Sequence, residues 1–184
     1  MGKKIAAAGL FLLAAALLVR GEKKGRAPLG VVPSVDLSRY AGRWYEVARL
    51  PNRFEEKCAG DVSAEYTPLG DGRIKVVNRC RKHDGRMTEA EGVARPADKS
   101  GANSRLKVRF APAYLSLLPF VWGDYHVIAL APDYSHALVG DPSRKYLWLL
   151  SRTPRMDEAT YTMLTEKARA EGFDVSRLIR TKQG

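Results

Sequence analysis

Three histidines, His83, His126 and His136, are the side chains in this sequence best suited to acid–base or metal chemistry. No nucleophile stands at a spacing that brings it next to a general base, and the chain has neither a phosphate-binding glycine loop nor a cluster of metal-ligand residues. His126 and His136 fall on neighbouring expected strands, but the turn near Asp133 offsets them. We therefore expect a protein that is not an enzyme and has no cofactor or metal. An enzyme, or a haem or metal site on these histidines, is the weaker alternative.

The two cysteines, Cys58 and Cys80, stand on either side of an expected hairpin whose turn contains Gly70. A hairpin centred there pairs residues whose numbers sum to about 140, which brings the two thiols close together. In an oxidising compartment they would form a disulfide. Such a cross-link contributes about 3 kcal/mol to stability by restricting the unfolded chain, and a structural role is favoured over a redox role.

Trp44 follows Gly42 in the run from Tyr40 to Arg49, and Arg152 stands at the end of the last expected strand. Glycine permits a close backbone approach, and tryptophan buries a large apolar ring while keeping one N–H that needs a partner. Eight antiparallel passes return a chain to the end where it began, so Arg152 should stack its guanidinium on the Trp44 indole. Gly42, Trp44 and Arg152 are thus predicted to close one end of a barrel.

The elements that position these residues follow from hydrophobic periodicity. From Arg43 to Arg152, apolar and polar residues alternate and turn residues interrupt them, which predicts short antiparallel strands. We expect strands at 43–50, 61–67, 73–81, 87–95, 104–111, 124–131, 136–140 and 145–152. Eight such strands predict an all-β fold, an up-and-down antiparallel β-barrel whose interior holds side chains or one small ligand.

After the last strand the period changes to that of a helix. Asp157 is the expected N-cap, and the helix should end near Glu171 and Gly172. Its apolar stripe consists of Tyr161, Leu164 and Ala168, with Met163 as a further candidate. The last strand is apolar on both faces, so we expect this C-terminal α-helix to pack on the outside of the barrel against Leu147 and Leu149.

The first residues have the pattern of an export signal. Lys3 and Lys4 precede an apolar segment, 5–19, that is shorter than a usual membrane span. We assign 1–20 to a signal peptide or hydrophobic leader, 21–34 to a linker and 35–184 to the folded domain; whether the leader is cleaved stays open. No cysteine follows the apolar segment, so we expect an exported protein of the periplasm or cell outer membrane without a lipoprotein-type acylated cysteine.

The chain carries 31 Lys and Arg against 20 Asp and Glu, a formal net charge of +11. A positive charge favours anionic partners, either nucleic acid or phospholipid head groups. The basic residues are spread over turns and outward positions and do not cluster on a single helix or β-ribbon. This distribution favours a lipid or an anionic ligand and argues against nucleic acid.

Three segments resemble the signature segments of the lipocalin family in order and spacing: Gly42-Arg43-Trp44-Tyr45, Asp133-Tyr134, and Arg152 after 147–151. The segments 124–130, 146–148, 151–154 and 171–176 are similar to the bacterial and apolipoprotein D-like branch. The resemblance covers 35–182. It implies an eight-stranded calyx that binds a fatty acid or a lysophospholipid and serves membrane lipid maintenance. Such relatives are usually anchored through a cysteine after the leader, which this chain lacks.

The inward-facing positions of the expected strands are the candidate ligand contacts, although barrel core is the simpler role for any one of them. The ligand-binding candidates are Tyr66, Val76, Asn78, Leu106, Val108, Phe110, Tyr125, Tyr146, Trp148 and Leu150. Ala48, Ala90 and Gly92 should also face inward. On 124–131 two choices stay open, with either Tyr125 and Val127 or His126 and Ile128 inside.

The loops at the open end carry basic residues suited to a carboxylate or phosphate head group. The expected head-group rim consists of Arg53, Lys57, Arg81 and Arg86, with Lys82, Arg144 and Lys145 nearby. The connection 112–122 is unusually apolar, and such surface indicates an interaction site. It lines the mouth in the interpretation we favour; the alternatives are contact with a membrane surface and a homodimer contact. A protein-interaction module that uses this loop is a further alternative function.

Overall fold

The computed structural model describes residues 27–184, so the predicted leader and the first part of the predicted linker lie outside the described residues. Two α-helices occur in this range, α1 (Leu37–Tyr40) and α2 (Glu158–Ala170). The strands described are β1 (Gly42–Arg49), β2 (Cys58–Pro68), β3 (Ile74–Lys82), β4 (Met87–Pro96), β5 (Arg105–Arg109), β6 (Gly123–Leu130), β7 (His136–Gly140), β8 (Leu147–Ser151) and β9 (Ile179–Arg180). Within the same range, no helix has both the length and the apolar character needed to cross a membrane.

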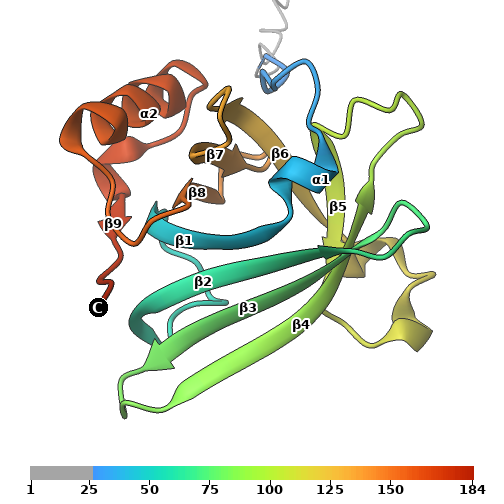
Figure 1. Cartoon of the computed structure of the whole chain (residues 1–184), viewed down its shortest axis with the longest axis horizontal. Coiled ribbons are helices and arrows are strands. Elements are labelled where there is room, and N and C mark those ends of the chain that lie inside the picture. Colours follow the sequence, from blue (N-terminus) through green and yellow to red (C-terminus); the bar gives the residue numbers. More distant parts are fainter. Residues whose placement is uncertain (1–26) are drawn as a thin grey trace, which may run out of the picture.

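Strands β1 to β8 form a closed antiparallel barrel (Figure 1). Each strand pairs with the next one along the chain, and β1 pairs with both β2 and β8. Trp44 lies opposite Ala64 on β2, and Tyr45 lies opposite both Ser63 and Ser151. The predicted eight-stranded up-and-down barrel is therefore confirmed. Every one of these strands has a partner on both sides, which removes exposed sheet edges.

Two apolar cores lie on opposite sides of the barrel wall. The inner core includes Trp44, Tyr66, Val76, Leu106, Val127 and Leu150. The outer core lies between the wall and α2, and it includes Leu138, Leu147, Leu149, Leu164, Ala168 and Phe173. The predicted helix on the outside of β8 is confirmed, and the Asp157 carboxylate caps it by accepting from the Thr160 backbone N–H. Met163, a candidate for the stripe, is instead 52% exposed.

An irregularity in β1 changes which residues face inward. Glu46 pairs with Leu150, but the next register pair is Ala48 with Leu149, so one residue is inserted between them. A bulge of this kind reverses the alternation of side chains beyond it. Ala48 consequently joins the outer core, and its predicted inward orientation is wrong. Arg49 takes the inward position opposite Trp148.

The structure also decides the orientation of β6. Tyr125 and Val127 belong to the inner core, whereas Ile128 packs in the outer core. His126 lies on the outer side, near Asp124, with its Nε2 at 3.7 Å from that carboxylate. Of the two alternatives left open by the sequence, Tyr125 and Val127 are therefore the inward residues.

Both ends of the described chain are tied to the barrel. Leu29 is buried in the outer core, and the backbone N–H of Val32 donates to the Val127 carbonyl. Within 27–34, the part of the predicted linker that the structure describes, Leu29 and Val32 thus contact the barrel. At the other end, β9 pairs with Ala48 and Arg49 of β1. The following residues reach β2, where the Asp61 N–H donates to the Lys182 carbonyl, so the C-terminal segment fills the gap between β1 and β2.

Candidate functional site

One end of the barrel is closed by the contact that the sequence predicts. The Arg152 guanidinium lies over the Trp44 indole, with 4.0 Å between its central carbon and the ring centroid. Its Nη1 and Nη2 donate to the carbonyls of Arg43 and Arg39 at 2.9 and 2.7 Å. Gly42 has a φ of +89°, a left-handed conformation that glycine adopts without strain. This arrangement ties the first strand, the last strand and α1 together at the closed end.

Three tyrosines, of which Tyr40 and Tyr66 are buried and Tyr125 is half-buried, form a polar floor above this closure. The Tyr125 hydroxyl lies 2.8 Å from that of Tyr40 and 2.9 Å from that of Tyr66. Burial raises the pKa of Tyr66 to about 12, and it raises the pKa of Tyr40 and Tyr125 as well, so all three hydroxyls stay neutral. Tyr66 and Tyr125, both ligand-binding candidates, therefore hydrogen-bond each other at the bottom of the calyx.

The candidates along the wall divide into a buried and an exposed group. Val76, Leu106 and Leu150 are buried in the inner core. Asn78 follows Val76 on the same face of β3 and is nevertheless exposed, as is Ala90 opposite it on β4. Solvent therefore reaches these two inward-facing positions near one end of the barrel.

Phe110 shows the same behaviour at the end of β5. A Cβ on Gly92 would lie 2.7 Å from the Phe110 ring, so the ring covers this glycine on the inward face. The Phe110 side chain is nevertheless 44% exposed. Val108, two residues earlier, is half-buried against the inner core. Phe110 therefore presents a partly exposed apolar ring on the inward face of the barrel wall.

Aromatic rings line the mouth beside β8. Tyr146 and Trp148 stack with ring centroids 6.1 Å apart, and Phe54 packs on Tyr146 at 5.5 Å. Phe54 belongs to the loop 51–57, which connects β1 to β2 and is called the A–B loop here. The A–B loop thus contacts two of the predicted ligand-binding residues.

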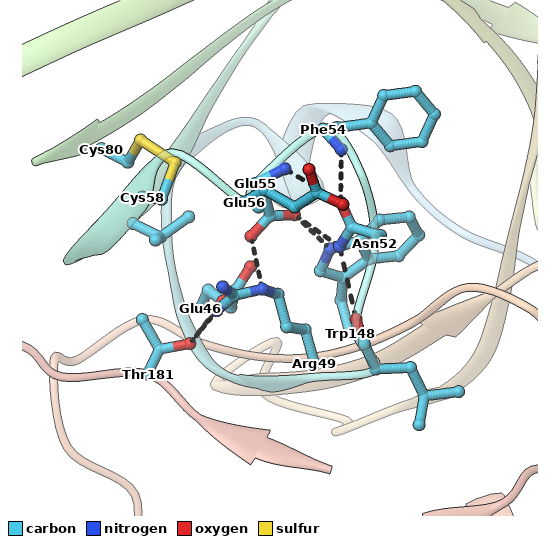
Figure 2. A network of polar contacts seen from close by, with 12 residues as sticks. Glu46, Arg49, Asn52, Phe54, Glu55, Glu56, Cys58, Cys80, Trp148 and Thr181 are labelled. Carbon is cyan, nitrogen blue, oxygen red and sulfur yellow. Dashed lines mark hydrogen bonds and ion pairs between the residues drawn. A yellow bond between two sulfur atoms is a disulfide. The ribbon is translucent and has the colours of Figure 1, made fainter. Parts of the chain in front are cut away.

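A buried polar network lies under the A–B loop (Figure 2). Arg49 Nη1 donates to Glu46 Oε1 at 3.0 Å, and Arg49 Nε lies 3.2 Å from Glu55 Oε2. The Trp148 indole N–H donates to Glu55 Oε1 at 2.8 Å. Thr181, from the C-terminal segment, donates its hydroxyl proton to Glu46 Oε1. The Arg49 guanidinium therefore contacts two carboxyl groups, those of Glu46 and Glu55.

The electrostatics of this network differ between its two carboxyl groups. Burial, followed by the neighbouring Glu55 carboxylate, holds the pKa of Glu46 well above its ordinary value. Of the two, Glu46 is the buried carboxyl group, and it holds a proton up to a higher pH than an exposed glutamate would. A hollow of about 400 Å³ opens beside the network; its lining includes Arg49, Asn52, Glu55, Cys58, His83 and Ile179.

Sequence reasoning missed Glu46, Arg49 and Glu55. Strict alternation from Trp44 puts Ala48 inside and Arg49 outside, and only the bulge reverses this order. Glu55 lies in a loop without regular period, so no pattern could orient it. The sequence gives one signal: Glu55 and Glu56 are acidic, although this loop is predicted to contribute Arg53 and Lys57 to a basic rim.

The predicted head-group rim is only partly brought together. Arg81 Nε lies 2.6 Å from the Asp61 carboxylate, and Arg86 Nη2 lies 2.7 Å from the Asp84 carboxylate, so each charge is balanced locally. Arg53 and Lys57 are exposed on the A–B loop. Arg144, named as a neighbour of the rim, instead donates to backbone carbonyls, among them that of Ala27.

The cysteines and histidines lie as follows. Cys58 and Cys80 form a disulfide, as predicted, and it joins the start of β2 to β3 next to the A–B loop. His126 pairs with Gly140 in the ladder of β6 and β7, and the Nδ1 of His136 lies 3.0 Å from the Ser135 hydroxyl. Among residues 27–184, no three His, Cys, Asp or Glu side chains gather as metal ligands.

The apolar connection 112–122 projects from the end of β5. Tyr114 is 82% exposed, Leu117 92% and Phe120 80%. At its base, the Trp122 ring lies under Arg95 at 4.3 Å and Arg109 at 5.3 Å. These cation–π contacts fix the end of the loop, while its apolar side chains point into solvent.

The comparisons with known proteins agree with this geometry. The sequence model of the family described as a lipocalin-like domain matches residues 35–183. The chain therefore belongs to the lipocalin family, whose members bind small hydrophobic ligands. Temperature-induced lipocalin-1 of Arabidopsis thaliana is 47% identical over 154 residues, which are 83% of this chain and 82% of that protein.

Bacterial and animal relatives match over most of their lengths. Outer membrane lipoprotein Blc of Escherichia coli strain K12 is 41% identical over 174 residues, 92% of each chain. Apolipoprotein D of Mus musculus is 30% identical over 188 residues, 95% of this chain and 94% of that protein. The solved structure of insecticyanin from the tobacco hornworm Manduca sexta has a TM-score of 0.66 at 21% identity and 86% coverage of each chain. This last similarity shows the fold alone.

Proposed function

We propose that this protein binds a fatty acid or a lysophospholipid in its calyx and stores or transports it in the cell envelope, in support of membrane lipid maintenance. The exposure of Asn78 and Phe110 on the inward face carries the proposal, because solvent, and therefore a small ligand, reaches these inward-facing side chains. The similarity to an outer membrane lipoprotein and to apolipoprotein D supports a lipid as the ligand.

The wall residues divide by role in this proposal. Asn78, Val108, Phe110, Tyr146 and Trp148 contact the ligand along the inward face of the calyx. The candidates that form the inner core or pack against it, Tyr66, Val76, Leu106, Tyr125 and Leu150, set its depth. Of the rim, Arg53 and Lys57 attract an anionic ligand to the mouth, since Arg81 and Arg86 are paired with aspartates. The role is binding and not catalysis.

The test is to purify the protein from cell envelopes and to measure the mass of the intact complex by native mass spectrometry. Any lipid that organic extraction releases is then identified. We expect one fatty acid or lysophospholipid for each protein molecule. Titration of the stripped protein with each lipid then measures affinity. Protein that carries no lipid and binds neither one on titration would reject the proposal.

We also propose that the protein is exported to the periplasm or the outer membrane without an acylated cysteine. Both cysteines of the sequence are joined in the disulfide, which an oxidising compartment favours. Fractionation of cells, with the mass of the mature chain measured, tests this proposal. Recovery of the protein in the cytoplasm with its two cysteines reduced would contradict it.

A second proposed role is contact with a membrane surface during lipid exchange, carried by the exposure of Tyr114, Leu117 and Phe120. Vesicle flotation compares the protein with a Leu117→Ser/Phe120→Ser variant, and Met163→Ser on α2 is the control because Met163 is also exposed. We expect only the loop variant to lose vesicle binding. A loop variant that instead abolishes a concentration-dependent dimer would show that the loop is a homodimer contact.

A further inference from the structure

We propose that Arg49 and the Trp148 indole N–H form a receptor for the anionic head group of the ligand, and that Glu55 occupies this receptor when no ligand is bound. The inference rests on the proposed function and specifies which head group the binding site accepts. Such a head group presents a pair of anionic oxygens, which a fatty acid supplies as a carboxylate and a lysophospholipid supplies as a phosphate.

The donors of this receptor are fixed by the barrel wall. Arg49 on β1 and Trp148 on β8 are direct partners in the register of the two strands. Both side chains face the interior, and Trp148 packs against the inner core. The guanidinium and the indole N–H lie on paired strands, so these donors are held in place before a ligand binds. A buried carboxylate or phosphate requires such preformed donors.

The acceptor, by contrast, comes from a loop. Glu55 places Oε1 at 2.8 Å from the Trp148 indole nitrogen and Oε2 at 3.2 Å from Arg49 Nε. Its backbone N–H donates to the side chain of Asn52 within the same loop. Figure 2 shows Glu55 reaching from the A–B loop towards the two wall residues. The Glu55 carboxylate thus stands where the head group of a bound lipid would stand.

The fit of Glu55 to the receptor is incomplete. Arg49 Nε and Glu55 Oε2 are close enough for an ion pair, but neither buried atom has a hydrogen bond among the described residues. A better-placed oxygen would complete the bond to Nε, which gives an incoming anion an advantage over the resident carboxylate. A hollow of about 400 Å³ adjoins both Arg49 and Glu55, so the space beside this ion pair is not filled by other side chains.

Charge balance selects the class of ligand. Arg49 is buried and lies against two carboxyl groups, the buried Glu46 and the half-buried Glu55, and the pKa of Glu46 is raised by burial. Exchange of Glu55 for an anionic head group conserves the charge beside Arg49 and releases Glu55 to solvent. An uncharged head group cannot take the place of Glu55, because Arg49 would then be left as a buried unpaired charge. An uncharged lipid must therefore bind with Glu55 still in place.

The experiment titrates the stripped full-length protein with three lipids of one chain length: myristic acid, myristoyl lysophosphatidylglycerol and uncharged monomyristoylglycerol. Glu55→Gln removes the competing charge and keeps the shape of the side chain. The control is Glu56→Gln, because the neighbouring Glu56 is exposed. We expect Glu55→Gln to tighten binding of an anionic lipid roughly ten-fold or more, since a charged hydrogen-bond pair no longer has to be broken. Monomyristoylglycerol binding should change less than about two-fold.

The gain should vanish in the double variant Arg49→Gln/Glu55→Gln. A gain shown by only one of the two anionic lipids identifies whether the source of the anion is a carboxylate or a phosphate. Equal affinities of charged and uncharged lipids in all variants would overturn the receptor and leave the proposed function standing. If none of the three lipids binds, both proposals fail.

A second measurement uses the unmodified protein and does not depend on the folding of a variant. Hydrogen exchange of the A–B loop amides is followed with and without each lipid. We expect an anionic lipid to accelerate exchange at Glu55, whose backbone N–H donates to Asn52, because displacement of the carboxylate frees the loop. Slower or unchanged exchange with bound myristic acid would contradict displacement of Glu55.

Discussion

At the scale of single residues, Arg152 does more than cover the Trp44 ring. Its guanidinium donates to the carbonyls of Arg39, Arg43 and Tyr134. We predict that Arg152→Ala lowers the free energy of unfolding by about 2 to 4 kcal/mol, because the cation–π contact and these charged hydrogen bonds are lost together. Urea denaturation measures the change.

The matched control for this variant is Arg43→Ala. Arg43 makes an exposed ion pair with Glu65, and such pairs contribute about 0 to 1 kcal/mol. A loss for Arg152→Ala no larger than that for Arg43→Ala would refute the closing role. Arg152→Lys should recover only part of the stability, since one ammonium cannot reach three carbonyls in the geometry of a guanidinium.

The buried carboxyl of Glu46 makes stability depend on pH. In the unfolded chain Glu46 titrates near its ordinary pKa of 4.5, and in the folded protein its pKa is well above that. The folded state therefore binds the proton more tightly. The stability due to the protonated group is complete below pH 4.5 and is lost as the pH rises through the folded-state pKa.

We predict that Glu46→Gln, which keeps a neutral hydrogen-bonding group, flattens the decline of unfolding free energy with rising pH. Urea denaturation at intervals between about pH 5 and pH 8 measures this slope. Glu89→Gln is the control, because Glu89 forms an exposed ion pair with Arg79. If both variants keep the slope of the unmodified protein, Glu46 is not its source.

At the scale of elements, α2 shields the outer face of β8. Leu164 is 1% exposed in the outer core, whereas its neighbour Met163 points to solvent. We predict that Leu164→Ala lowers the unfolding free energy by about 2 to 4 kcal/mol through the cavity it leaves. Met163→Ala should cost less than about 0.5 kcal/mol. Equal effects in denaturation experiments would mean that α2 does not pack as described.

At the scale of the whole molecule, the barrel is completed by its own C-terminus. The Gln183 side-chain amide donates to the carbonyls of Glu46 and Val62, both at 2.8 Å, and so joins β1 to β2 where their own pairing has ended. We predict that Gln183→Ala lowers the unfolding free energy by about 1 to 3 kcal/mol, because both carbonyls lose their donor.

The neighbouring Lys182 provides the control, since its backbone carbonyl makes the contact with Asp61 and its exposed side chain is dispensable. Lys182→Ala should therefore leave stability within about 0.5 kcal/mol of the unmodified protein. Hydrogen exchange at the Asp61 amide gives a local readout, which we expect to accelerate only in Gln183→Ala. Equal exchange in both variants would show that the tail does not seal the wall.

The sequence by itself determined the barrel, its closure and its helix. Period-two alternation requires strands with one apolar face, and the spacing of Trp44 and Arg152 on the first and last strands requires that they meet. The hairpin that includes Gly70 likewise brought Cys58 and Cys80 together. These features depend on local pattern and on topology, both of which are written along the chain.

Only the tertiary structure decided which charges enter the calyx. One residue inserted in β1 moves Ala48 to the outer core and Arg49 to the interior, and no alternation pattern records that insertion. Glu55 enters from a loop, and Thr181 from the tail, because contacts with distant strands hold them there. The physical reason is the same in each case: a buried charge is placed by its partners, and these partners lie far from it in the sequence.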